Sequence, residues 1–257
     1  MTRIARRSLL TRMAALGTGA VAASGCSKID SFATSESGEG LFDRAEDWHR
    51  TAHRTLAGQQ SLAPEYAPED RSPSFKGNGS LSVDSPVYRD QLAKGFPDWR
   101  ISVKGLVDNP LRLSLDDLKA LPQRTQITRH DCVEGWSAIG EWTGPQLSGL
   151  LDTAKVREEA NFIVFWCADV LYGRRYYESV DMVDAYHPQT IIAHSLNGEP
   201  IPEKNGAPLR MRIERQLGYK HAKYLTGIEA VARLDDIAGG KGGFWEDIGN
   251  YQWYAGI

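Results

Sequence analysis

One cysteine of this chain lies among polar residues that could take part in chemistry. The stretch RHDCVEGWS, residues 129–137, places His130, Asp131 and Glu134 within two positions of Cys132. A structural cysteine usually packs among aliphatic side chains, whereas a thiolate that binds a metal or reacts needs polar groups to stabilise its charge. The stretch therefore indicates chemistry at Cys132 without saying which chemistry.

The residues alone leave several roles open for Cys132. Structural zinc needs several His and Cys ligands, but Cys167 lies 35 residues further on and no CxxC occurs. A thiol protease needs a catalytic histidine, for which His187, His194 or His221 could serve, although no family signature surrounds the cysteine. A disulfide between Cys132 and Cys167, or a plain buried thiol, is the simplest interpretation of the spacing.

The elements that must position Cys132 are predicted to be short strands with brief helices between them. Alternating or apolar runs predict strands over residues 99–107, 124–132, 161–169, 175–180, 190–196, 208–215 and 222–234, the last closing the sheet. Helical spacing and caps predict helices over residues 114–121, 143–154 and 181–188, and NGEP at 197–200 predicts a turn. This order indicates an α+β fold with mixed sheets and short helices rather than a doubly wound sheet.

A helix and an irregular segment are predicted ahead of these strands. Apolar residues recur every three to four positions from Phe42 onward, which predicts a short amphipathic helix that ends at Gly58. Residues 59–95 are rich in Pro, Ser, Gly and Asp, which predicts an irregular wrap over a domain surface. We therefore assign residues 41–71 to helix and irregular wrap, and residues 72–257 to one domain.

Composition and charge limit the classes of function. The chain has 257 residues, of which 41% are hydrophobic and 25% charged, enough for one substantial core or two small ones. Four arginines are the only charged residues among the first 26, so the net charge of −3 becomes −7 for the remainder. An acidic body argues against nucleic acid as a partner.

The first 26 residues have the pattern of an export signal. Arg6 and Arg7 precede a weakly apolar run from Met13 to Ala23, which is shorter than the roughly 20 residues of a membrane span. The arginine pair resembles a twin-arginine signal, which carries folded, cofactor-loaded proteins. An ordinary secretory signal with two arginines is the alternative.

The end of this signal resembles a lipoprotein processing site. In ASGC, Cys26 would be the lipidated first residue of the mature protein, although Ala23 replaces the usual leucine. Residues 27–40 are polar and rich in Ser and Gly, as expected for a flexible tether. We expect a location in the periplasm or cell envelope, with a lipid anchor on Cys26, and a simple signal is the alternative.

Several motifs follow one another in a fixed order along the chain. They are CVEGWS with EWTG, then WCAD with YYESVDMVDAYHPQT, then LNGEPIPEKNGAPLRMRIERQLGYKHAKYLTGIE. From about residue 72 to the C-terminus, they resemble the molybdopterin-binding domain of the sulfite oxidase family. Within that family the chain looks most like exported bacterial enzymes that consist of the cofactor domain alone, a group that includes periplasmic methionine sulfoxide reductases.

The resemblance implies a molybdenum–molybdopterin cofactor with Cys132 as the single protein ligand of the metal. A soft thiolate suits a high-valent metal that is otherwise held by two dithiolene sulfurs. In an extended segment the side chain of Glu134 would project to the same face and relay protons, and a solvated loop carboxylate is the alternative. Trp136 and Ser137 would shape the loop.

The resemblance also implies contacts to the rest of the cofactor, whose phosphate needs cationic side chains and amide donors. The contacts carried over are Asn205 and Arg210 in NGAPLR, His221, Ala222 and Lys223 in YKHAKY, and Asn78 in FKGNGS, with Arg89 as a rival. In methionine sulfoxide reductases a threonine 35 positions after the cysteine ligand contacts the cofactor. Here that residue is Cys167, which could contribute its thiol or a backbone amide.

These observations predict an exported oxidoreductase that moves an oxygen atom, with two electrons, between water and a small substrate such as a sulfoxide or sulfite. A non-catalytic cofactor-binding accessory or storage protein is the alternative, and the presence of Cys132 argues against it. The chain has no CxxCH for haem and no room for an immunoglobulin-like dimerisation domain. We therefore expect a monomer that exchanges electrons with a separate carrier, either a cytochrome, a membrane haem subunit or a quinone-linked protein.

The C-terminal segment is rich in aromatic residues. It contains Phe244, Trp245, Tyr251, Trp253 and Tyr254 among several glycines. The residues could line a substrate entrance or complete the core, and the sequence does not decide between these roles.

Overall fold

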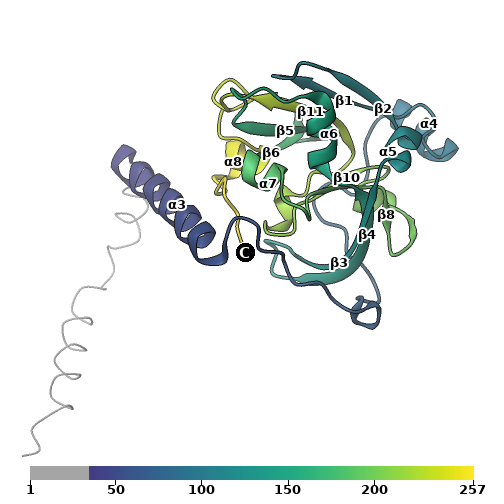
Figure 1. The fold of residues 1–257 in the computed structure, drawn as a ribbon, viewed down its shortest axis with the longest axis horizontal. Coiled ribbons are helices and arrows are strands. Elements are labelled where there is room, and N and C mark those ends of the chain that lie inside the picture. Colours follow the sequence, from purple (N-terminus) through teal and green to yellow (C-terminus); the bar gives the residue numbers. More distant parts are fainter. Residues whose placement is uncertain (1–34) are drawn as a thin grey trace, which may run out of the picture. The chain divides into compact units, whose positions relative to one another are not determined.

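A computed structural model describes residues 35–257 of the chain (Figure 1). The predicted signal, the lipidation site and residues 27–34 of the predicted tether lie outside these described residues. Contacts divide the chain into two units, residues 1–52 and 53–257. Within residues 35–257, no helix combines the length and apolarity that a membrane span requires.

The first element described is the helix α3, Glu36–Ala57, which ends just before Gly58 as predicted. It begins earlier than predicted, so residues 36–40, which we had assigned to the tether, are helical. Polar composition without apolar periodicity argues against a buried helical face, but it does not exclude a solvated helix. In the part of α3 that belongs to the first unit, Arg50 pairs with Asp47 at 2.8 Å.

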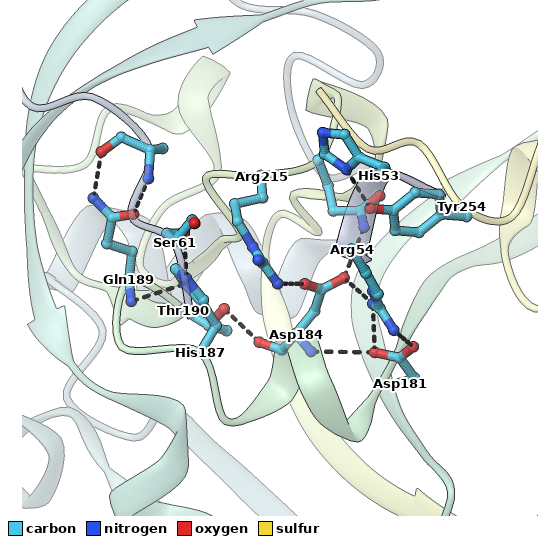
Figure 2. Close-up of polar contacts among 12 residues, drawn as sticks. His53, Arg54, Ser61, Asp181, Asp184, His187, Gln189, Thr190, Arg215 and Tyr254 are labelled. Atoms are coloured by element: carbon cyan, nitrogen blue, oxygen red, sulfur yellow. Dashed lines mark hydrogen bonds and ion pairs between the residues drawn. The ribbon is translucent and has the colours of Figure 1, made fainter. Parts of the chain in front are cut away.

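The last turn of α3 belongs to the second unit, where buried ion pairs hold it. Arg54 Nη2 donates to Asp181 at 2.9 Å and to Asp184 at 3.0 Å, and Arg215 donates to Asp184 at 2.8 Å (Figure 2). Asp181 also caps the short helix α7, Met182–Ala185, by accepting from the Asp184 amide. Asp184 thus lies between two arginines, and both compensate its negative charge.

The predicted irregular wrap contains a helix. Residues 59–85 hold only the 3-10 turn η1, Pro68–Asp70, but α4 spans Pro86–Lys94. Ser85 caps α4 by accepting from the Tyr88 amide, and Pro86 occupies its first turn. The Ser and Pro residues that suggested a loop here are therefore the start signals of a helix, and the prediction was wrong over this segment.

The centre of the second unit is a five-stranded sheet in the order β2-β1-β11-β5-β6 (Figure 1). Its strands are β1 Arg100–Gly105, β2 Leu111–Ser114, β5 Phe162–Leu171, β6 Arg174–Asp181 and β11 Leu225–Val231. β11 pairs parallel with β1 and antiparallel with β5, so the last strand lies inside the sheet instead of at its edge. The mixed sheet confirms the predicted α+β class.

A second sheet has the order β3-β4-β8-β9, and a separate pair joins β7 to β10. The bounds are β3 Gln123–Asp131, β4 Ser137–Pro145, β7 Ile191–Ala193, β8 Ser195–Leu196, β9 Glu199–Pro200 and β10 Arg210–Arg212. β3 and β4 form a long curved hairpin (Figure 1). The strand predicted over residues 190–196 is divided between two sheets, and the strand predicted over 208–215 is shortened to β10.

Short helices connect these strands or follow them along the chain. They are α5 Leu115–Ala120, α6 Leu147–Ala154, η2 Glu203–Asn205, η3 Gly218–Lys220 and α8 Phe244–Gly249. Ser114 and Asp117 form a capping box at the start of α5, as the sequence predicted for Ser114. The helix predicted from Thr143 begins only at Leu147, because Thr143 and Pro145 still pair with β3.

Two hydrophobic cores support the sheets. The larger core includes both β1 and β5, with Ile101 and Phe165 completely buried, and the smaller core surrounds the buried Trp142 of β4. Phe75 packs edge-on against Trp142 with ring centroids 5.1 Å apart. The hairpin β3–β4 is thus anchored by its own core, which fixes the turn that carries Cys132.

Candidate active site

Cys132 lies in the tight turn that joins β3 to β4. The Cys132 amide donates to the Trp136 carbonyl and the Gly135 amide donates to the Cys132 carbonyl, both at 2.9 Å. Gly135 has φ of 85°, a left-handed conformation that favours glycine. The prediction of an extended segment between Cys132 and Glu134 is therefore wrong. The turn nevertheless brings both side chains to one pocket.

The pocket is open to solvent, and its space of about 670 Å³ includes part of the surrounding solvent. Six of its lining residues carry the groups that matter for binding and proton transfer: Asn78, Cys132, Glu134, Asp169, Tyr176 and Lys223. They come from the β3–β4 turn, from β5 and β6, from the segment before β11 and from the loop before α4. Residues far apart in the sequence therefore converge at Cys132.

The Cys132 thiol is mostly buried, with 6% of the residue exposed. The Asn78 side-chain amide donates to its sulfur at 3.6 Å. Burial raises the pKa of Cys132, so the side chain is a neutral thiol unless a nearby positive charge, such as a metal ion, stabilises the thiolate. Its position suits a metal ligand better than a free nucleophile.

Cys167 lies elsewhere, fully buried in the larger core. Cys132 and Cys167 are both free thiols, so the disulfide interpretation is wrong. Burial raises the pKa of Cys167 well above its usual range, and the thiol does not line the pocket. The neighbouring Ala168 amide already donates to the Tyr224 carbonyl at 2.9 Å, whereas Asp169, two residues on, reaches the pocket.

Glu134 lies at the pocket with about half of its side chain exposed. Its Oε2 accepts a hydrogen bond from the Trp136 indole at 2.9 Å and lies 3.6 Å from Lys76 Nζ. The Lys76 ammonium also lies over the Trp136 ring, 5.3 Å from its centroid. Trp136 and Lys76 thus orient a carboxylate that remains accessible to solvent and to the pocket.

Arg210 is completely buried and has no carboxylate partner. It donates to the backbone carbonyls of Asn205 at 3.0 Å and of His221 at 3.4 Å, and its Nε has no partner. Its guanidinium lies over the Trp142 ring, as does that of Arg212. Burial, followed by the charge of Arg212, lowers the pKa of Arg210 to about 9.

Lys223 is the second buried cation at the site. Its ammonium donates to the carbonyls of Asn78 at 2.7 Å and Lys204 at 3.2 Å, and also to that of Ser80. Burial, followed by the charge of Arg210, lowers the pKa of Lys223 to about 7. Gly206 has φ of 106°, and a Cβ there would lie 2.8 Å from Lys223 Cβ, so the NGAPLR turn approaches Lys223 closely only with glycine.

These two cations differ from the other buried cations of the described residues. Arg54 and Arg215 pair with aspartates, Arg212 pairs with Glu214, and Lys220 pairs with two glutamates. Neither Arg210 nor Lys223 has an ion pair within residues 35–257. A buried positive charge without a counter-ion is costly, so the site is built for an anion that the protein itself does not supply.

Several buried polar atoms near these cations also lack partners. They are Arg210 Nε, Asn205 Oδ1, His221 Nδ1 and Asp169 Oδ1. Burial and the neighbouring arginines lower the pKa of His221 well below its usual range, so its ring is neutral, and its Nε2–H donates to the Gln216 carbonyl at 3.0 Å. A molybdopterin offers an anionic phosphate, pterin N–H groups and a thiophilic metal. The donors and acceptors present here fit all three parts.

The remaining predicted residues are placed differently. Ala222 is buried, with its carbonyl accepting from the Met211 amide, so it adds backbone to the site. Arg89 lies exposed on α4, 3.4 Å from Asp84, and does not line the pocket, whereas its rival Asn78 does. His130 is buried on β3, with Nδ1 2.9 Å from Arg212 Nη1.

The sequence analysis missed Tyr176 and Ser80 as pocket residues and noted Asp169 only as a neighbour of Cys167. The signal for Tyr176 was present, because RYYESV buries five consecutive residues of β6 and does not alternate as a surface strand would. Nothing in the sequence around Ser80 marks it as different from other loop serines.

The aromatic C-terminal segment contributes different residues to the pocket and to the core. Trp245 and Tyr251 line the pocket and stack with centroids 5.6 Å apart. Phe244 and Tyr254 are buried, and Trp253 packs edge-on against Phe162. The pocket therefore has an aromatic wall that is continuous with the core.

Comparison with known proteins gives a family match over most of the chain. The model of the family described as "Oxidoreductase molybdopterin binding domain" matches residues 88–236. A putative protein-methionine-sulfoxide reductase subunit YedZ1 of Azospira oryzae is 35% identical over 98% of this chain and 88% of its own length.

Two further relatives are named protein-methionine-sulfoxide reductase catalytic subunit MsrP. The protein of Campylobacter jejuni is 32% identical over 54% of this chain, and that of Xanthomonas campestris is 34% identical over 58%. The chain spans about half the length of these two relatives, 51% and 48% respectively.

Among solved structures, the sulfane dehydrogenase SoxCD of Paracoccus pantotrophus aligns with a TM-score of 0.50 at 20% identity, over 68% of this chain and 46% of that one. That likeness concerns the fold alone. Together these comparisons confirm the predicted family resemblance and the predicted fold.

Proposed function

Because the chain belongs to the oxidoreductase molybdopterin-binding domain family, we propose that it reduces a sulfoxide, methionine sulfoxide in particular. The reaction takes up two electrons and two protons, yields a thioether and releases water. The observation that supports this most strongly is that the Cys132 thiol and the unpaired cation Lys223 line one pocket, with the unpaired Arg210 buried close enough to Lys223 to lower its pKa. The names of the curated relatives supply the substrate class.

Each residue of the site has a distinct task in this proposal. When bound, the molybdenum cofactor supplies the two-electron chemistry by which oxygen is exchanged. Cys132 would hold the metal, Arg210 and Lys223 the phosphate, and Asn205 and His221 the polar groups of the pterin. Cys132 and Glu134 at one pocket favour catalysis over storage, because a storage protein needs the phosphate contacts more than the thiolate.

Glu134 would move the proton. Its Oε2 is fixed by the Trp136 indole, and its exposure to solvent lets it exchange a proton between turnovers. Trp245 and Tyr251 would exclude water from one side of the pocket and contact the apolar part of the substrate.

The character of the pocket favours a neutral sulfoxide over anionic sulfite. Lys223 is the one cation among its described lining residues, and the phosphate would occupy it. Lys76 pairs with Glu134 instead of standing free. The carboxylates Glu134 and Asp169 line the pocket and would repel a dianion, whereas aromatic walls suit a thioether.

The test is a comparison of both directions with purified, cofactor-loaded protein. A reduced dye would donate electrons for reduction of methionine sulfoxide and other sulfoxides, and an oxidised dye would accept electrons from sulfite. We expect kcat/KM for sulfoxide reduction to exceed that for sulfite oxidation. Faster sulfite oxidation would overturn the assignment and reverse the direction of oxygen transfer.

A separate electron carrier is part of the proposal. Relatives are named as subunits, and the chain has no CxxCH for covalent haem. The carrier would be a cytochrome, a membrane haem subunit or a quinone-linked protein, and this chain would be a monomer in contact with it. Co-purification with a haem protein from the native membrane would support this, and direct reduction by a soluble nicotinamide cofactor would contradict it.

Export of the loaded protein to the periplasm or cell envelope is also proposed. It depends on Arg6 and Arg7, and replacement of both by lysine should leave cofactor-loaded protein in the cytoplasm. Lipid anchoring depends on Cys26, and mass spectrometry of the mature N-terminus tests it. An unmodified residue other than Cys26 at that end means that no lipid anchor is attached.

A further inference from the structure

Two carboxylates and one lysine form a fully buried cluster beside the pocket. Lys220 Nζ lies 2.8 Å from Glu178 Oε2 and 2.5 Å from Glu246 Oε1. All three side chains are at most 1% exposed. Glu178 belongs to β6, Lys220 to η3 and Glu246 to α8, so three separate elements build the Glu178–Lys220–Glu246 cluster.

The charges of this cluster do not balance if both carboxyls are ionised. One ammonium and two carboxylates give a net charge of −1 in a region that solvent does not reach, and neither carboxylate has another ion pair among the described residues. Two carboxylates that share a buried site usually bind one proton between them, because the second charge is too costly. One bound proton makes the cluster neutral.

The geometry marks where this proton would lie. Glu246 Oε2 has no hydrogen-bond partner, and Glu178 Oε2 has only the Lys220 ammonium as its partner. Both lie within 2.5 Å of the position that a Cβ on Gly243 would take, so the two oxygens face the same point beside that glycine. A proton held between these two oxygens would give Glu246 Oε2 the partner it lacks. Burial, followed by the charge of Glu246, also raises the pKa of Glu178 well above its usual range.

The other titratable groups around the cluster do not supply the missing positive charge. Tyr176 and Tyr177 on β6 and Cys167 on β5 stay neutral because burial raises the pKa of each. Asp169 on β5 and Asp247 on α8 are acidic, and the Tyr177 hydroxyl donates to Asp247 at 2.7 Å. Lys220 is therefore the cation that faces the two carboxyls.

Tyr176 connects the cluster to the pocket. Its hydroxyl lies 3.3 Å from Glu178 Oε1 and 2.9 Å from the Tyr219 carbonyl, and both tyrosines line the pocket. Phe244 stacks on the Tyr176 ring with centroids 5.1 Å apart, which fixes the ring between the pocket and the cluster. A proton on Glu178 is thus one hydroxyl away from the pocket.

We propose that Glu178 and Glu246 share one proton and deliver it through the Tyr176 hydroxyl into the pocket. This inference rests on the proposed reduction of a sulfoxide, in which two electrons come from the separate redox carrier and two protons are consumed. In the step, the Tyr176 O–H proton moves to the oxygen that leaves the substrate as water. For this transfer the proton of the pair lies on Glu178 Oε1, the oxygen 3.3 Å from the Tyr176 hydroxyl; that O–H bond breaks, and the proton restores the Tyr176 hydroxyl.

No electrons move in this transfer. The carboxylate left on Glu178 is stabilised by Lys220, and a proton that enters from the pocket through the Tyr176 hydroxyl restores the pair before the next turnover. Glu134 on the exposed side would handle the other proton. Tyr176 is then a catalytic residue. Glu178, Glu246 and Lys220 are positioning residues that hold the Tyr176 hydroxyl and resupply its proton.

Infrared spectroscopy tests the shared proton without any turnover. A protonated carboxyl has a C=O stretching band that shifts in D2O, and we expect such a band at neutral pH in the full chain. Glu178→Gln should remove it, and Glu246→Gln gives a second variant in case the first does not fold. The matched control is Asp184→Asn, which removes a buried carboxylate paired with Arg54 and Arg215 and should leave the band intact.

Tyr176→Phe tests the delivery. The substitution keeps the ring on Phe244, so cofactor content, KM and the infrared band should stay unchanged. Removing one proton donor should lower kcat by about 100-fold or more. In the wild type, kcat should fall as pH rises through the apparent pKa of the carboxyl pair, and the variant should lose this limb of the profile.

The outcomes separate the two proposals. Absence of the carboxyl band in the wild type, or its survival in both glutamine variants, overturns the shared proton. A Tyr176→Phe protein with the wild-type kcat and pH profile overturns the delivery and leaves the cluster a structural feature. Loss of sulfoxide reduction from the wild type itself overturns the proposed function, and the infrared result stands independently of it.

Discussion

Lys223→Met should empty the protein of cofactor with little effect on the stability of the cofactor-free fold. Lys223 is buried beside Arg210 without a carboxylate partner, and burial lowers its pKa from 10.5 to about 7. A shift of this size corresponds to roughly 5 kcal/mol of unfavourable charge burial at 1.36 kcal/mol per pKa unit. Three hydrogen bonds to backbone carbonyls offset much of it, at about 1.5 kcal/mol or more each. The unfolding free energy at pH 7 should therefore change by less than about 2 kcal/mol.

Lys220→Met is the matched control. Lys220 is also buried but pairs with Glu178 and Glu246, so its loss leaves uncompensated carboxylates and should cost about 3–5 kcal/mol. Urea denaturation of cofactor-free protein, followed by tryptophan fluorescence, compares the two variants. For the loaded protein, loss of a charged hydrogen bond to phosphate should weaken cofactor binding by about 10- to 100-fold. Molybdenum and pterin content would be measured in the purified proteins.

The pH dependence gives a second, independent reading of Lys223. Because its folded-state pKa lies below its unfolded-state value, the unfolded chain binds more protons between about pH 7 and 10.5. The burial of the Lys223 charge lowers the stability of the cofactor-free wild type at pH 7, and this loss is recovered as pH rises through the window, by about 2 kcal/mol from pH 7 to 9. Lys223→Met should lack this rise. Full cofactor content in Lys223→Met, or a loss of stability equal to that of Lys220→Met, would refute the assignment of Lys223 to an absent anion.

Three further substitutions test the β3–β4 turn. Cys132→Ser should abolish turnover while pterin remains bound, because the phosphate contacts come from other groups, and an active, molybdenum-loaded variant in metal analysis and dye-linked assays would end the proposed role. Glu134→Gln should slow turnover by about 100-fold and alter its pH profile without reducing cofactor content, and an unchanged profile would assign proton transfer elsewhere. Gly135→Ala should destabilise the protein by about 1–2 kcal/mol, measured by denaturation, because alanine disfavours φ of 85°, and wild-type stability would show that the turn relaxes.

The strands that were predicted correctly are those whose local pattern matches their burial. β1 and β3 alternate, and β5 is a long apolar run, so each carried its own signal. β4 was missed as a strand because glycine occupies part of its buried face. A Cβ at Gly140 would lie 3.0 Å from Phe75 and Leu196, and one at Gly144 would lie 2.0 Å from the Ile192 carbonyl. Where neighbours approach this closely, the core-facing residue has no side chain, and a hydrophobicity pattern cannot register it.

The sequence predicted the residue types of the site, but it did not predict which of its cations form ion pairs with carboxylates. The run RMRIER presents Arg210, Arg212 and Arg215 as three similar cations. In the fold, Glu214 pairs with Arg212, Asp184 pairs with Arg215, and only Arg210 is left for an external anion. Which cation remains unpaired depends on where the fold places carboxylates that are distant in the sequence, and Asp184 lies in the N-terminal turn of α7. The sequence around Arg210, Arg212 and Arg215 therefore cannot predict that Asp184 pairs with Arg215.

The unpaired cations also have a consequence for the order of folding and loading. Arg210 and Lys223 raise the free energy of the cofactor-free fold, and an anion that binds them lowers it by an amount that grows with cofactor concentration. The loaded protein is then the more stable species, and the loaded state should resist unfolding by urea and proteases better than the cofactor-free state. A site of this kind benefits from being filled where the cofactor is made. That requirement accords with the proposed twin-arginine route, which moves a protein only after it has folded around its cofactor.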